Sequence, residues 1–201
     1  MSAAVSPGRA NQRKRTRKAI LAAAARLSAQ GRTPTLEEVA EEAMVSRATA
    51  YRYFPNVEAL IVEASLDIAF PDAAALFADG VRDPAERLER AERAVHEMVV
   101  GHEGALRMML AHSVTLTPAS DGMDVRQNRR TPLIEAALEP ARKAMDPAHF
   151  DRLSKALAML IGTESMIVCK DVLGIGADEA LAVKLWAVRS LLAAAMRGEQ
   201  A

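Results

Sequence analysis

Three helix starts follow one another closely in the segment TPTLEEVAEEAMVSRATAYRYFPNVEAL, at Thr35, Ser46 and Asn56. Thr35 followed by Glu38 is the pattern of a capping box, in which each residue's side chain bonds the other residue's exposed amide. Ser46 and Asn56 are also residue types that cap helices. Starts this close leave room for only two short helices joined by the turn AMVS. The segment therefore predicts a helix-turn-helix unit.

Helix signals continue along the rest of the chain, and strand signals are nearly absent. Asp83-Pro84 and Asp146-Pro147 each place a capping residue before a proline at the first helical position. We expect an all-α fold of about nine helices, at roughly 15–30, 35–42, 46–53, 56–70, 84–100, 103–116, 124–145, 147–172 and 177–197.

Charge is distributed unevenly although the net charge is zero. Residues 1–60 hold ten Lys/Arg and five Asp/Glu, and residues 61–201 hold sixteen and twenty-one, so the two parts carry +5 and −5. Residues 1–18 contain six basic side chains and no acidic one. A basic end on a neutral protein indicates a face for a polyanion, and a solvated tail is the alternative.

The third helix carries the side chains that a DNA groove requires. At 100° per residue, Arg47, Ala48, Tyr51 and Arg52 share one arc, whereas Ala50 and Tyr53 lie on the opposite side. Arginine can bond guanine edges bidentately, and alanine allows close approach or touches a thymine methyl group. Ser46 and Thr49 can bond phosphates, which sets the register on the duplex.

With these residues in order, the segment 35–60 resembles the N-terminal signature of the tetracycline-repressor (TetR) family of bacterial transcriptional regulators. The resemblance covers about 45 residues and implies a three-helix DNA-binding domain whose third helix enters the major groove. It also implies a larger helical domain that binds an effector and dimerises. We accordingly expect a basic, disordered arm at 1–14, a DNA-binding domain at 15–60 and an effector and dimerisation domain at 61–201.

The resemblance gives roles to individual residues. Arg47, Ala48, Tyr51 and Arg52 take the base-facing positions. The positions that contact the DNA backbone are taken by Thr35, Ser46, Thr49 and Tyr53, and the basic arm adds Arg13, Lys14 and Arg15. This sequence departs from the family pattern at two positions. Met44 replaces the usual turn glycine, at a cost on the order of 1 kcal/mol if its φ is positive, and Val57 stands where a phosphate-contacting lysine is common.

The last two expected helices are broadly apolar, which suggests that they pair with a second copy of the chain. The family also dimerises there, and an internal core is the alternative for each residue. The candidate interface residues are Leu157, Ile161, Leu181, Leu185, Val188 and Leu192.

Flexible and polar side chains between 84 and 172 are the candidates for an effector pocket, although methionines at helical spacing more often belong to a core. The candidates are Met98, His102, Met109, His112, Met159 and Glu164. Glu164 lies in an apolar stripe and needs a partner, and we favour a structural role for it. The four histidines lack metal-ligand spacing and no enzymatic motif is present, so we expect no metal, no cofactor and no catalytic residues.

These features predict a cytoplasmic, dimeric regulator that binds a palindromic operator in double-stranded DNA, most simply a repressor released by a small-molecule effector. A single cysteine, Cys169, fits a reducing compartment, and we expect no membrane span or signal peptide. A DNA-packaging protein without an operator, or a helical ligand-binding module that does not recognise DNA, are the alternatives. The sequence does not name the operator, the regulated genes or the effector.

Overall fold

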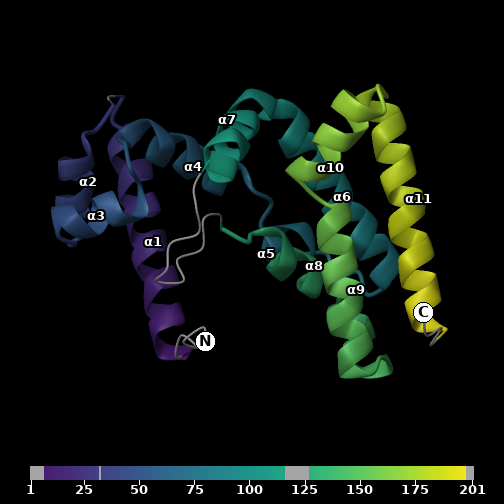
Figure 1. Cartoon of the computed structure of the whole chain (residues 1–201). Helices are drawn as coiled ribbons and strands as arrows, with labels where there is room; N and C mark the ends of the chain where they lie inside the picture. Colours follow the sequence, from purple (N-terminus) through teal and green to yellow (C-terminus); the bar gives the residue numbers. More distant parts are fainter. Residues whose placement is uncertain (1–6, 32, 116–126, 198–201) are drawn as a thin grey trace, which may run out of the picture. The chain divides into compact units, whose positions relative to one another are not determined.

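The computed structural model describes residues 7–31, 33–115 and 127–197, and within them it contains helices and no strands, which confirms the all-α prediction (Figure 1). The chain divides into two compact units. The N-terminal unit runs to Ala69 and also takes in the segment that starts at Gly104. The C-terminal unit comprises Phe70–Glu103 and the part that starts at Gln127.

Four helices pack together in the N-terminal unit: α1 (Pro7–Ser28), α2 (Leu36–Glu42), α3 (Arg47–Tyr53) and α4 (Val57–Ala69). Helix α1 packs against both α2 and α4, and α2 packs against α3. Their shared core is formed by Ile20, Leu21, Ala23, Ala24, Leu27, Leu36, Val39, Ala40, Ala50, Tyr53, Phe54, Leu60 and Ala64. Helix α7 (Glu103–Thr115) belongs to this unit from Gly104 onward.

The three predicted helix starts of this unit are confirmed. The Glu38 amide donates to the Thr35 hydroxyl at 3.2 Å, and the Thr35 amide donates to the Glu38 carboxylate at 2.7 Å, which completes the capping box. Ser46 accepts from the Thr49 amide at 3.1 Å. Asn56 accepts from the Ala59 amide at 2.8 Å. Each cap satisfies an amide that the first helical turn leaves without a partner.

The C-terminal unit is built from α5 (Ala73–Leu76), α6 (Pro84–Gly101), α8 (Arg130–Leu138), the 3₁₀ helix η1 (Glu139–Ala144), α9 (Pro147–Leu160), α10 (Thr163–Ile167), the π-helix η2 (Val168–Val172) and α11 (Ala177–Met196). Helix α11 packs against α6 and α9, and α8 packs against the same two helices. The predicted Asp83 and Asp146 caps are present, since each accepts from the amide two residues on.

The helices differ from the predicted ones in four places. Helix α1 begins at Pro7 instead of residue 15, because a proline in the first turn starts a helix readily and the following residues favour one. The predicted helix 124–145 is helical from Arg130 and tightens to 3₁₀ geometry at Glu139, beside Pro140, which has no amide to donate. Helix α5, capped by Asp72, was not predicted.

The fourth difference is a break in the predicted helix 147–172 at Gly162, whose φ is 134°. A side chain is disfavoured there by that angle and also by space, since a Cβ atom would lie 2.9 Å from the Arg130 guanidinium carbon. Arg130 occupies this place because it donates to the Ala158 carbonyl at 2.9 Å and pairs with Glu164 at 2.6 Å. Glu164 thus has the partner that its apolar surroundings demand.

The turn between α2 and α3 has a left-handed residue at its predicted position. Met44 has φ 54°, the only positive φ of a non-glycine residue in the described part of the chain. Its amide bonds the Glu41 carbonyl and the Val45 amide bonds the Ala40 carbonyl, both at 2.9 Å, which is the Schellman pattern of a helix end. The Met44 side chain is 93% exposed, so no packing offsets the strain of this conformation.

Replacing Met44 with glycine should therefore stabilise the N-terminal unit by about 0.5–1 kcal/mol, because relief of the left-handed strain exceeds the added entropy of glycine in the unfolded chain. Native-state hydrogen exchange of the amides in α2 and α3 measures this change in the full chain. Met44→Ala is the control, since it shortens the side chain and keeps the strain. Equal stabilisation by alanine and glycine would show that the φ angle is not the cause.

Candidate nucleic-acid interface and ligand pocket

Helix α3 presents to solvent the side that its spacing predicts. Arg47, Ala48 and Arg52 are exposed and Tyr51 is half exposed, and we call these four residues the recognition face. Ala50 and Tyr53 point into the core on the other side. Sequence spacing therefore placed the two sides of this helix correctly, and the contacts of the four residues with DNA bases stay a prediction.

The recognition face has an acidic neighbour that the sequence did not reveal. The Tyr51 hydroxyl donates to a Glu37 carboxylate oxygen at 2.9 Å, and this bond raises the pKa of Tyr51. The pKa of Glu37 is lowered, first by its own backbone amide and then by the Tyr51 hydroxyl. Glu37 thus stays ionised and orients the phenol. A carboxylate here repels phosphates, while it can accept from the amino group of a cytosine.

The residues predicted to contact the DNA backbone fall into two groups. Thr35, Ser46 and Thr49 lie at the starts of α2 and α3, where Ser46 and Thr49 also bond each other at 2.8 Å. These hydroxyls are therefore held in fixed positions before any DNA arrives. Tyr53 differs, because only 8% of it is exposed and its ring belongs to the core, with the Arg52 guanidinium 5.7 Å from the ring centre.

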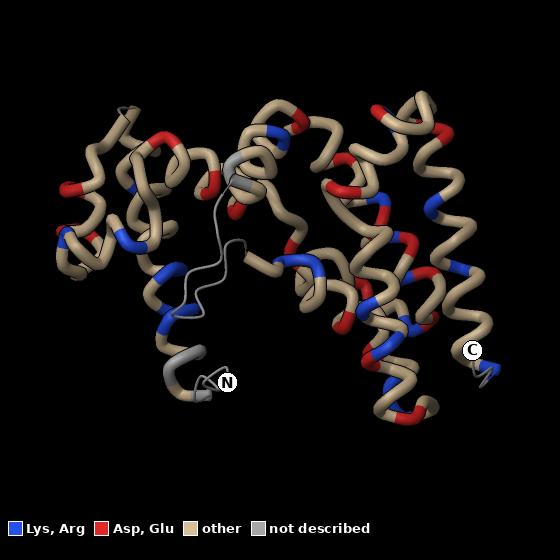
Figure 2. The backbone as a smooth tube through the Cα atoms, in the orientation of Figure 1, with Lys and Arg blue, Asp and Glu red and all other residues tan. Residues whose placement is uncertain are grey.

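The basic arm at 1–14 was expected to be disordered, but from Pro7 onward it is part of α1, along which basic residues recur (Figure 2). Residues 1–6 of this arm lie outside the described residues. Lys14 and Arg15 are exposed and Arg13 is half-buried. Arg17 has a structural role that the sequence did not show. It pairs with Glu63 of α4 at 2.5 Å, and its guanidinium lies 4.7 Å from the centre of the Phe54 ring. Arg17 therefore joins α1 to α4 and to the end of α3.

A shallow hollow of about 430 Å³ lies on this unit between the starts of α2 and α4. Its lining includes Glu37, Glu58 and Val57 and no lysine or arginine. Val57 is the position where the family often carries a phosphate-contacting lysine. The hollow therefore lacks the charge that would draw a phosphate into it, and the basic side chains of α1 are the ones suited to that contact.

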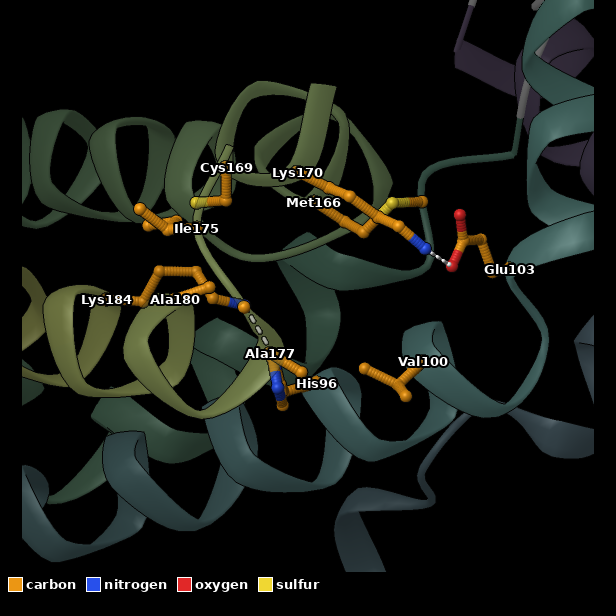
Figure 3. Close-up of a pocket in the computed structure, with 11 residues that line it drawn as sticks. His96, Val100, Glu103, Met166, Cys169, Lys170, Ile175, Ala177, Ala180 and Lys184 are labelled. Atoms are coloured by element: carbon orange, nitrogen blue, oxygen red, sulfur yellow. Dashed lines mark hydrogen bonds and ion pairs between the residues drawn. The ribbon is translucent and has the colours of Figure 1, made fainter. Parts of the chain in front are cut away.

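A second cavity, of about 140 Å³, lies within the C-terminal unit (Figure 3). It is lined by His96, Val100, Glu103, Met166, Cys169, Lys170, Ile175, Gly176, Ala177, Ala180 and Lys184. None of the predicted pocket residues is among them. Met159 is 77% exposed, His102 caps the end of α6, and Glu164 pairs with Arg130. Met98 and Met109 are half-buried, and the side chain of His112 lies outside the described part of the chain.

Buried charges meet at one end of this cavity. The Lys184 ammonium lies 2.5 Å from a Glu92 carboxylate oxygen and 3.0 Å from Nδ1 of His96. Burial raises the pKa of the fully buried Glu92, and the nearby Lys184 opposes that rise. The pKa of His96 is lowered, first by burial and then by the charge of Lys184. The imidazole is therefore neutral at physiological pH and accepts a hydrogen bond from the ammonium.

The predicted dimer residues lie inside the C-terminal unit. Leu157 and Ile161 are fully buried, and Leu185, Val188 and Leu192 are at most 6% exposed. Leu181 is half-buried. Helical periodicity cannot separate a side chain buried in its own unit from one buried by a partner, which is why the sequence selected these residues. The large apolar side chains exposed on the described α9 and α11 are Met159, Val183, Trp186 and Met196.

Metal and membrane sites are also absent from the described ranges. No group of three or more His, Cys, Asp or Glu side chains comes together there in a way that could hold a metal ion. No helix in this part of the chain combines the length and hydrophobicity that crossing a bilayer requires.

Comparison with known proteins agrees with this architecture. Residues 20–64 match the family described as "Bacterial regulatory proteins, tetR family". Among solved structures, the chain is similar to Thermus thermophilus FadR, a TetR-family transcriptional repressor in complex with lauroyl-CoA. That likeness covers 88% of this chain and 93% of that chain, with 24% sequence identity and a TM-score of 0.55, and it shows a common fold. The chain has no match among curated proteins.

The matched residues contain α2, α3, their caps and the recognition face, and the similarity in fold extends over most of the chain. A regulatory family also agrees with the expectation that the protein is not an enzyme. Residues 20–64 therefore carry the sequence of the DNA-binding domain of the tetR family of transcriptional regulators, and the chain as a whole shares its fold with a repressor of that family.

Proposed function

We propose that this regulator works in the cytoplasm as a homodimer that binds a palindromic operator and represses transcription until a small-molecule effector releases it. The N-terminal unit binds the DNA, and the C-terminal unit dimerises and holds the effector. The observation that carries the proposal is the recognition face on α3, with two arginines and a tyrosine exposed around one alanine.

The arrangement suits the major groove because α3 is short, capped and exposed on one side. Arg47 and Arg52 offer planar donors for guanine, and Ala48 between them allows the helix to approach the bases. Thr35, Ser46 and Thr49, with Arg13, Lys14 and Arg15 of α1, supply the contacts that set position and add affinity without sequence preference. We assign Tyr53 a lesser part than the other backbone contacts because its ring is buried.

We infer a dimer because one such helix contacts only a few base pairs. A single recognition helix covers one half-site, and two of them about 34 Å apart cover both halves of a palindrome. An effector that favours a different separation lowers the population of the DNA-binding state. FadR, with lauroyl-CoA bound, supports the idea that a repressor of this fold accommodates a small molecule.

Selection of bound duplexes from a random library, at near-physiological salt, tests this function. We expect enrichment of an inverted repeat with half-sites about one helical turn apart. Binding without enrichment would favour the DNA-packaging alternative, which the acidic balance of residues 61–201 argues against. A protein that binds no duplex under these conditions would be a helical ligand-binding module.

Arg47→Ala should weaken binding to the selected operator by about 1–3 kcal/mol, or about 5- to 150-fold, and relax preference at one base pair of each half-site. Lys14→Ala is the control, because it also removes one positive charge. We expect it to weaken binding to every sequence alike and to reduce the salt dependence. Fluorescence anisotropy with operator and mismatched duplexes measures both effects. If Arg47→Ala behaves like Lys14→Ala, then Arg47 contacts the backbone and not a base.

The dimer interface should include the exposed side of α11 around Trp186. Val183 lies about one turn before Trp186, and Ala182, Ser190 and Ala193 on that side are exposed and small, while the exposed Arg189 beside them is paired with Glu89. An apolar ring beside small side chains is suited to close packing against a second copy. The predicted residues such as Leu185 and Val188 would then support the interface from within the unit.

Trp186→Glu should convert the dimer to a monomer at micromolar concentration, because each partner then buries a carboxylate near the two-fold axis. Sedimentation velocity measures the association state. Ala148→Glu, an exposed change at the start of α9 that adds the same charge, should leave the dimer intact. A Trp186→Glu variant that remains dimeric would place the interface elsewhere.

A further inference from the structure

The cavity in the C-terminal unit has apolar walls and one polar end. Val100 of α6, Met166 of α10, Cys169 of η2 and Ala180 of α11 contribute to the walls. His96 and Lys184 lie together at the polar end, and Lys170 and Glu103 pair at 2.6 Å elsewhere on its lining (Figure 3). At about 140 Å³ the cavity lies below the 300–1,000 Å³ that is usual for drug-sized ligands, so it suits a small molecule.

The polar end has an unused donor. An ammonium group carries three N–H donors, and within the described residues Lys184 contacts two partners, Glu92 and His96. Lys184 is 4% exposed and lines the cavity, so water reaches its remaining donor poorly. A hydrogen-bond acceptor inside the cavity would therefore complete an incompletely satisfied buried group.

A second, independent observation is the backbone beside the cavity. Residues Val168–Val172 form a π-helix, and two of them, Cys169 and Lys170, line the cavity. The Ile175 amide bonds the Cys169 carbonyl at 3.0 Å, which holds the next stretch of lining against this turn. π-Helical turns are rare and are found frequently at functional sites.

The charges around the cavity select the class of ligand. Lys184 and Lys170 carry two positive charges, and Glu92 and Glu103 carry two negative ones. Each of these lysines is thus already paired with a carboxylate, and Asp178 and Glu97 add negative charge near His96, so an added carboxylate would bring an uncompensated negative charge close to the buried Glu92. An uncharged ligand avoids that cost.

We propose that this cavity is the effector site and binds a small, uncharged, mainly apolar molecule with one hydrogen-bond-accepting oxygen, which accepts from Lys184. The inference rests on the proposed function and gives its effector a site and a chemical class. Ketones, esters and phenols of six to ten carbon atoms are the compounds that this description covers.

One residue of the cavity lining is directly followed in the chain by the N-terminal, DNA-binding unit. Glu103, which pairs with Lys170 on the lining, is the first residue of α7, and the chain joins the N-terminal unit from Gly104 onward. A ligand that shifts the Lys170–Glu103 pair therefore acts on the segment that connects the two units. Binding in the cavity can in this way change the population of the state that binds DNA.

Nuclear magnetic resonance of the methionine methyl groups in the full chain tests the site with acetophenone as the probe. We expect the Met166 signal to shift on titration and the signals of the exposed Met44 and Met159 to stay unchanged. Ethylbenzene, which lacks the oxygen, and benzoate, which is charged, should each bind at least about ten-fold more weakly. No shift at Met166 would overturn the site. Equal binding of ethylbenzene would overturn the role of Lys184, and tighter binding of benzoate would overturn the ligand class.

Two variants distinguish the effect of changing the cavity from the effect of disturbing the fold. Ala180→Leu fills the cavity and should abolish the shift at Met166, whereas Ala148→Leu, at an exposed helical position, should leave it unchanged. The double change Lys184→Met with Glu92→Met removes both charges together, which avoids leaving one of them buried alone. This variant should bind acetophenone and ethylbenzene equally. A retained preference for the ketone would contradict the assigned hydrogen bond.

DNA affinity measured with and without acetophenone distinguishes this inference from the proposed function. A fall in operator affinity that Ala180→Leu prevents supports the effector site. A shift at Met166 with unchanged operator affinity would show a ligand site that does not control DNA binding and would overturn the effector assignment. Failure of the wild-type protein to select any DNA sequence would count against the proposed function alone, because the cavity is tested by the methyl signals.

Discussion

The recognition face depends on a core shared by four helices. Helices α2 and α3 have seven residues each, and helices this short are not stable in isolation. They form because their buried sides complete a cluster with α1 and α4, and because caps satisfy their exposed first amides. The Arg17–Glu63 pair fixes α1 to α4 at the edge of that cluster. The exposed arginines of α3 are therefore held in place by the buried core and the helix caps beneath them.

The parts of this arrangement that the sequence predicted are local. A capping box links residues three apart, and the two sides of α3 follow from helical spacing over seven residues. The left-handed turn at Met44 was anticipated for the same reason, since it belongs to the end of one helix. Such features are set by neighbouring residues, and they do not depend on how distant segments meet.

The parts that could not be predicted depend on segments far apart in the chain. Arg17 and Glu63 are 46 residues apart, and Arg130 and Glu164 are 34 apart. Lys184 meets His96 across 88 residues, and this contact creates the polar end of the cavity. A signal was present in the sequence, because Lys184 interrupts the apolar run LAVKLWAV just as Glu164 interrupts its own stripe. Neither position indicated which distant residue would be its partner.

The buried ion pair of Lys184 and Glu92 is better explained by a function than by the stability of the fold. Apolar residues of similar size in place of a buried ion pair commonly leave stability unchanged or increase it, because the loss of hydration exceeds the gain in attraction. Folding alone therefore gives little reason to place these charges between α6 and α11. By contrast, Arg17–Glu63 joins α1 to α4 and Arg130–Glu164 joins α8 to α10. Each arginine also contacts a second group of the fold, the Phe54 ring or the Ala158 carbonyl, so a fold role accounts for both pairs. Of these three pairs, only Lys184–Glu92 borders the cavity, and a ligand that uses the remaining ammonium donor supplies the reason that packing does not.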